Sequence, residues 1–142
     1  MRRPSDLLAL ALGLLAGLQL LHVLDQLRTD PDASFPALLA TPQVVAGVGG
    51  ALVALVLVRR GAPSGRRLAI AVGVLVATGF AIVHGIPVAT ARAEPYWGDG
   101  SADAVQWIGV IAIWSCCAWV IVLARARAMS EYGIERGERA RA

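Results

Sequence analysis

Two histidines are the residues of this sequence best suited to chemistry. His22 stands in the stretch LQLLHVLDQL, three residues before Asp25, and His84 stands in FAIVHGIP. Gln19, His22, Asp25 and Gln26 recur at steps of three and four residues, which stack on one face of a helix. Ionisable groups inside apolar helices are costly and usually face a protein interior, where they mark a site.

Several chemistries suit such a set. The His22–His84 pair with Asp25 can ligate Zn, Cu or Fe, and two imidazoles on facing helices can hold a b-type haem. A quinone or lipid head group hydrogen-bonded by His and Asp is a third reading. In a fourth, the histidines and Asp25 only satisfy one another as a structural clasp. The polar residues expected to orient these ligands are Gln19, Gln26, Asp103 and Gln106.

Nothing else in the sequence forms a catalytic set. Cys116 and Cys117 are adjacent in an apolar stretch, whereas a redox pair would normally be spaced Cys-x-x-Cys near water. They are expected to pack as small apolar side chains. The sequence therefore favours a binding protein over an enzyme.

The composition indicates the bilayer. Of 142 residues, 57% are hydrophobic and 16% charged, with a mean hydropathy of +0.65, whereas soluble domains carry about a quarter charged residues. The pI near 9.5 does not indicate nucleic acid, because the basic residues lie in short clusters at the ends of apolar runs. All thirteen are Arg, which together with much Ala, Gly, Leu and Val suggests a high-GC bacterial genome and a bacterial inner membrane.

Four apolar runs can span the membrane as helices, so the predicted fold is all-α, a four-helix antiparallel bundle in one domain over residues 1–124. Residues 35–40 lie in the interface or form the first part of a second helix kinked at Pro42; the interfacial reading is preferred, with Thr41 as N-cap and Pro42 at N1. Residues 59–67 are predicted as a turn and residues 125–142 as a polar tail, helical or disordered. The four helices are predicted at about 6–27, 42–58, 68–88 and 102–123.

The arginines also predict the orientation. Eleven of them lie in the N-terminus, the middle loop and the tail, while the other two loops carry only Arg28 and Arg92. Both termini are therefore expected in the cytoplasm. With this topology His22 and His84 lie at one level in the outer leaflet, since a helix rises about 1.5 Å per residue. Asp103 and Gln106 begin the fourth helix at that level.

LHVLDQL and FAIVHGIP together resemble a family of small four-helix membrane proteins of high-GC Gram-positive bacteria. Those proteins carry His-x-x-Asp on the first helix and Val-His with a nearby Pro late on the third. The resemblance spans most of the chain. It implies the same topology and draws attention to His22, Asp25 and His84, but it implies no reaction, because no activity is assigned to the family.

Two functions follow as expectations. The first is a membrane protein with an outer-leaflet His/Asp site for a metal, haem or quinone-like ligand. The second is a non-catalytic accessory or scaffold subunit that packs against a partner in a larger membrane complex, with the His/Asp cluster as a clasp.

Overall fold

The computed structural model describes residues 4–29, 32, 34–85 and 102–139, with side chains described as far as residue 126. Within these residues every regular element is a helix. The predicted end of the third helix at residue 88 and the loop with Glu94, Tyr96, Trp97 and Asp99, expected at the outer interface, lie outside the described residues.

Four helices of the described chain are long and apolar enough to cross a membrane. They are Ser5–Thr29, Pro42–Arg59, Pro63–His84 and Ala104–Ala126. This confirms the prediction of an all-helical protein with four such helices, and it indicates a multi-pass membrane protein.

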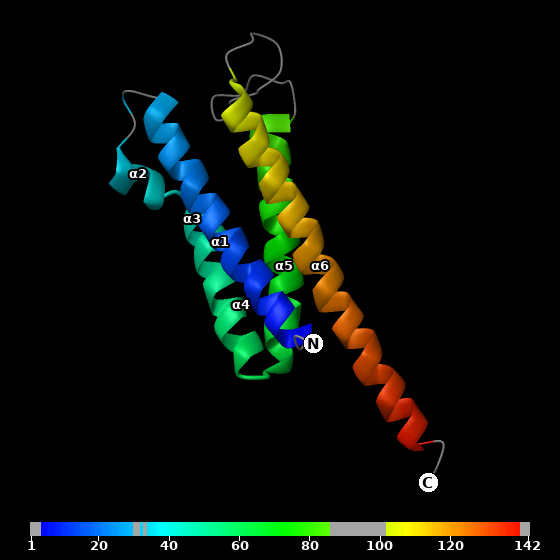
Figure 1. Cartoon of the computed structure of the whole chain (residues 1–142). Coiled ribbons are helices and arrows are strands. Elements are labelled where there is room, and N and C mark those ends of the chain that lie inside the picture. The colour runs from blue at the N-terminus through cyan, green and yellow to red at the C-terminus, as the bar shows by residue number, and fades with distance from the viewer. Residues whose placement is uncertain (1–3, 30–31, 33, 86–101, 140–142) are drawn as a thin grey trace.

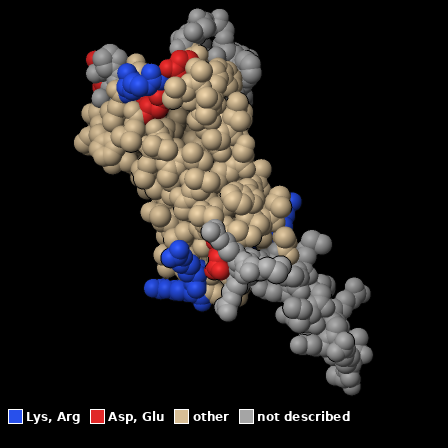
Figure 2. Space-filling view, viewed as in Figure 1, with Lys and Arg blue, Asp and Glu red and all other residues tan. Residues whose placement is uncertain are grey.

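Each of the four long helices makes its most extensive contacts with two neighbours. Helix α1 (Pro4–Thr29) contacts α4 (Gly50–Arg59) and α6 (Ala104–Arg139), and α5 (Pro63–Phe80) contacts the same two (Figure 1). Leu8, Leu12 and Leu15 of α1 are fully buried in the shared core. Large apolar side chains such as Ile108, 67% exposed, cover the outside, as a lipid-facing surface requires. Figure 2 shows the charged groups of one face gathered toward the two ends of the helices, with an uncharged band between.

The second span is broken at its start. Helix α2 (Phe35–Leu39) is a separate short helix against α1, and the chain turns at Thr41 before α3 (Pro42–Val44). The Thr41 hydroxyl accepts a hydrogen bond from the Val44 N–H at 3.4 Å, so the predicted start with a Thr cap and Pro at N1 is confirmed. The segment 35–40 is thus not the first part of a continuous second helix.

Two stretches of π-helix interrupt the α-helical spans. The first, η1 (Val45–Gly49), joins α3 to α4, and the second, η2 (Ala81–Gly85), continues α5. Such turns are rare and occur frequently at functional sites. Neither was predicted.

One predicted helix start is wrong. Helix α5 begins at Pro63 rather than near residue 68, because proline is well suited to the first turn of a helix, and the turn before it is correspondingly shorter. Helix α6 continues past the predicted span to Arg139. Of the two predictions for the tail, the helical one is therefore confirmed over most of its length, since its Arg and Glu residues are good helix formers.

Candidate functional site

The structure brings the two histidines together. The rings of His22 on α1 and His84 on η2 meet edge to face, with centroids 5.1 Å apart and planes at 79°. Phe80, at the end of α5, completes an aromatic triangle, with its ring centroid 4.9 Å from that of His22 and 5.5 Å from that of His84. All three side chains are buried. Two titratable rings from separate helices thus share one buried environment.

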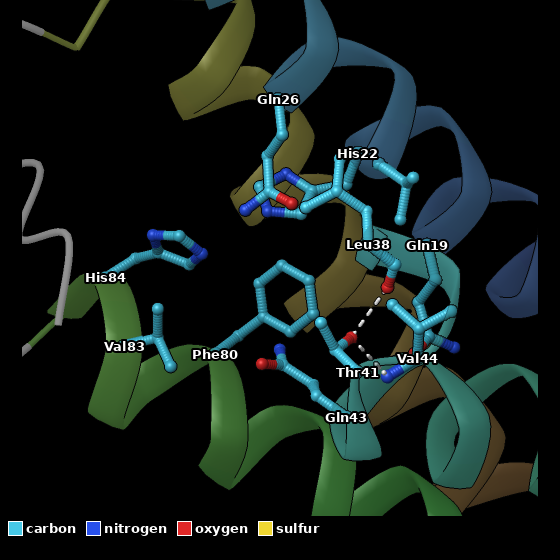
Figure 3. Close-up of a pocket in the computed structure, with 11 residues that line it drawn as sticks. Gln19, His22, Gln26, Leu38, Thr41, Gln43, Val44, Phe80, Val83 and His84 are labelled. Carbon is cyan, nitrogen blue, oxygen red and sulfur yellow. Dashed lines mark hydrogen bonds between the residues drawn. The ribbon is translucent and has the colours of Figure 1, made fainter. Parts of the chain in front are cut away.

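A cavity of about 220 Å³ lies beside these rings, and we call it the histidine cavity (Figure 3). Three segments form its wall: α1, the stretch from α2 to α3, and the end of α5 with η2. Its polar lining consists of both histidines, three amides and one hydroxyl. The polar lining residues are Gln19, His22, Gln26, Thr41, Gln43 and His84. The apolar ones are Val23, Leu38, Val44, Phe80 and Val83.

The Nε2 atom of His22 is buried and has no hydrogen-bond partner. His22 is only 7% exposed, so this nitrogen is also withdrawn from water. An unsatisfied buried polar atom costs about 1–3 kcal/mol, a cost that a bound ligand able to hydrogen-bond to it would offset. A closed structural clasp would leave neither a cavity nor an unpartnered imidazole nitrogen. The geometry therefore disfavours the clasp.

Gln19 is held at the cavity wall by close packing against Gly47. Its Nε2 donates to the Leu15 carbonyl at 3.3 Å, and its side chain is 3% exposed. A Cβ atom on Gly47 would overlap Gln19 Oε1 and lie 3.1 Å from Gln19 Cδ. The glycine thus lets η1 approach α1 closely enough to fix the amide.

Sequence reasoning missed Gln43, Thr41 and Phe80 as cavity residues. Gln43 follows the Thr41–Pro42 helix start, where a polar side chain in an otherwise apolar span was the available signal. Phe80 carried no signal, because one apolar residue in an apolar helix is unremarkable. The Thr41 hydroxyl donates to the Leu38 carbonyl at 2.8 Å (Figure 3). This hydrogen bond links α2 to the start of α3 at the cavity wall.

Asp25, Asp103 and Gln106 do not line the histidine cavity. Asp25 instead accepts from Arg28 Nε at 2.9 Å, and Arg28 Nη2 reaches Asp103 Oδ2 at 2.6 Å. We call Asp25, Arg28 and Asp103 the charge cluster. It links the end of α1 to the start of α6, so neither acid shares the histidine cavity, although Asp25 and His22 both line a second hollow between these two helices.

Asp103 also caps α6. Its Oδ1 accepts from the Gln106 N–H at 3.0 Å, and Gln106 Oε1 accepts from the Asp103 N–H at 2.9 Å. This reciprocal pair is a capping box. The pKa of the Asp103 carboxyl lies below its ordinary value, first because the Gln106 N–H donates to it and then because Arg28 does.

The residues do not fit either of the two metal-containing groups predicted from the sequence, a b-type haem or a metal ion. A b-type haem held by both histidines needs a flat slot between the imidazoles, whereas these rings meet edge to face and Phe80 packs against both. Among the described residues no group of three or more His, Cys, Asp or Glu can hold a metal ion. A metal at this site would have only two imidazole ligands.

Cys116 and Cys117 do not line the histidine cavity. Both are buried free thiols, and Cys116 Sγ donates to the Ala11 carbonyl of α1 at 3.4 Å. They help to pack α6 into the core.

No protein-family model, curated protein or solved structure matches this chain. The resemblance to small four-helix membrane proteins therefore stays a prediction, and the case for function rests on the site itself.

Proposed function

We propose that the chain is an integral membrane protein of a bacterial inner membrane, with an antiparallel four-helix bundle and both termini in the cytoplasm. In its outer leaflet the histidine cavity binds a small neutral ring with carbonyl or hydroxyl oxygens, as in a quinone head group. One observation carries the proposal. His22, whose buried Nε2 has no hydrogen-bond partner, lines a cavity together with other polar side chains.

The size of the cavity supports a single ring. At about 220 Å³ it holds the volume of about seven water molecules, at roughly 30 Å³ each. Drug-sized ligands occupy clefts of about 300–1,000 Å³. A single six-membered ring with its oxygens fits this volume, whereas a macrocycle exceeds it.

The chemistry of the wall supports a neutral ligand. Imidazole N–H groups and the amide NH₂ groups of Gln26 and Gln43 can donate hydrogen bonds to carbonyl oxygens, whereas the unprotonated imidazole nitrogens and the amide oxygens can accept from hydroxyls. Phe80 and Val83 offer apolar surface to a ring face. Among the described residues, no acidic or basic side chain apart from the histidines lines the cavity, which favours a neutral ligand.

The test is a binding titration on detergent-purified protein, with a benzoquinone carrying one isoprene unit as the probe. His22→Leu and His84→Leu are each expected to weaken binding about tenfold or more, since a hydrogen bond from a buried donor contributes about 1.4 kcal/mol. Gln26→Leu should weaken it less. Gln106→Leu, an amide outside the cavity, is the control and should leave affinity within about twofold.

Three results would overturn the proposal. The proposal of a quinone-like ligand is refuted if the wild-type protein has no measurable affinity for the probe, or if both histidine variants keep full affinity. Stoichiometric metal in purified protein that is lost in His22→Leu assigns the site to metal instead. Co-purification of one protein partner regardless of the histidine variants favours the accessory-subunit alternative.

A further inference from the structure

A second hollow lies on the other side of His22, between α1 and α6, and we call it the α1–α6 groove. It encloses about 460 Å³, a volume in the range of small-ligand sites. Leu21 and Leu24 of α1 and Val105 and Ile108 of α6 line it, each more than half exposed. A Cβ atom on Gly109, at the groove, would meet no atom within 4 Å. The groove is therefore an open apolar channel along two adjacent helices.

The charge cluster stands at one end of this groove. Asp25 and Arg28 line the groove directly, and Arg28 bridges to Asp103 on α6. Figure 2 shows the basic group with acidic groups beside it at that end of the molecule. The side chains of Arg28 and Asp103 are 51% and 43% exposed, so they remain accessible to a ligand. Two carboxylates and one guanidinium leave a net charge of −1 (−2 + 1).

This charge pattern selects among lipid head groups. A primary ammonium can donate hydrogen bonds to the carboxylates of Asp25 and Asp103 while its charge offsets the surplus. The guanidinium of Arg28 has five N–H donors, and only Nε and Nη2 are used in the cluster, which leaves donors for a phosphate. A quaternary ammonium has no N–H to donate, and an anionic head group is repelled by the surplus negative charge.

We propose that the α1–α6 groove binds a phospholipid with a primary ammonium head group, of the phosphatidylethanolamine class. One acyl chain lies in the groove against Gly109, the ammonium meets the carboxylates of the charge cluster, and the phosphate meets Arg28. This inference rests on the proposed membrane insertion but is independent of the ligand in the histidine cavity.

The experiment is lipid binding by native mass spectrometry of the detergent-purified full chain. The probe is an equimolar mixture of phosphatidylethanolamine, phosphatidylcholine and phosphatidylglycerol with identical acyl chains. Wild-type protein should retain the ethanolamine lipid over the glycerol lipid about fivefold or more, the ratio that roughly 1 kcal/mol gives. Asp103→Asn should reduce this ratio to within about twofold of unity, because the net charge of the cluster becomes zero.

The groove itself is tested by filling it. Gly109→Leu, and independently Ala112→Leu at the same groove, should abolish binding of all three lipids. Gly49→Leu is the matched control. A Cβ atom on Gly49 also meets nothing within 4 Å, but Gly49 does not line the groove. The Gly49→Leu variant should therefore bind the lipids as the wild-type protein does.

Equal retention of the three lipids by wild-type protein would overturn the inference, as would lipid binding that survives both filling variants. A dimer that Gly109→Leu dissociates would assign the groove to a second copy of the chain and overturn it as well. Failure of the proposed membrane insertion is distinguishable, because alkaline carbonate would then release the protein from membranes without detergent.

Discussion

Substitution of Gly47 by alanine is a sharp test of the histidine cavity, because one methyl group should disturb both stability and binding. The new Cβ would overlap Gln19 Oε1 and lie 3.2 Å from Val76 Cγ2. Gln19 must therefore leave its position at the cavity wall, where its Nε2 donates to the Leu15 carbonyl. Gly49, two residues further along the same π-helical segment, has open space at its Cβ and supplies the control.

The expected magnitude follows from three contributions. Overpacking a core costs about 1–3 kcal/mol, and loss of the Gln19–Leu15 hydrogen bond costs about 0.5–1.5 kcal/mol. Alanine in place of glycine stabilises a helix by about 1 kcal/mol, which offsets part of this loss. Gly47→Ala should thus lower the free energy of unfolding by about 2 kcal/mol, whereas Gly49→Ala should leave it unchanged or raise it by up to about 1 kcal/mol.

The assay is unfolding of the detergent-solubilised protein by titration with SDS, followed by tryptophan fluorescence, with quinone affinity measured on the same samples. The double variant Gly47→Ala/Gln19→Ala removes the clashing side chain. Its free energy of unfolding should be about 1–2 kcal/mol higher than the sum of the two single effects predicts. Equal stability of Gly47→Ala and Gly49→Ala, or a double variant that is merely additive, would refute the reasoning that Gly47 fixes Gln19.

Three further outcomes are expected. The folded-state pKa of Asp103 lies below its ordinary value, so the carboxylate stabilises the fold above its unfolded-state pKa, and this stability is lost as the pH falls through the folded-state pKa. SDS titrations from pH 7 downward should therefore show a decrease in the free energy of unfolding, and this decrease should be smaller in Asp103→Asn. Reporter fusions after Arg60 and after Ala142 should read cytoplasmic and fusions near Asp32 and Asp99 external, and a cytoplasmic reading at Asp99 would contradict the topology. Protein-loaded liposomes should show no proton or metal flux above that of empty ones, since the inner halves of the predicted spans carry no acidic or basic residue beyond Asp6 at the cytoplasmic end of the first.

The sequence was informative where a physical rule relates one residue to its own helix. The apolar runs predicted four long helices, and Thr41 followed by Pro42 predicted a helix start, because both signals depend on local backbone chemistry. The rise per residue also placed His22 and His84 at one level, and their rings lie in contact.

The same reasoning failed where rotation around the helix decides a residue's partner. Asp25 and Gln26 were assigned to one polar stripe, but neighbouring residues on a helix point about 100° apart. Gln26 turns toward the histidine cavity, whereas Asp25 turns toward the α1–α6 groove and pairs with Arg28. Arg28, three residues further along, was counted only as a topology signal. Its reach to Asp103 depends on how α1 and α6 pack, which no local pattern encodes.

The π-helical turns add an argument that the sequence does not contain. Each of them interrupts a span that could have been α-helical throughout, and π-helical turns are rare in proteins. One of them carries His84, which lines the cavity. The other carries Gly47, and because Gly47 has no side chain, η1 packs closely enough to keep Gln19 at the cavity wall. One uncommon backbone turn thus supplies part of the cavity wall, and the other packs against Gln19 of that wall; His22 of the same wall has an unpartnered Nε2. Packing alone would favour closing such a space with apolar side chains, because a buried polar atom without a partner is destabilising. A ligand that hydrogen-bonds to His22 would offset that cost.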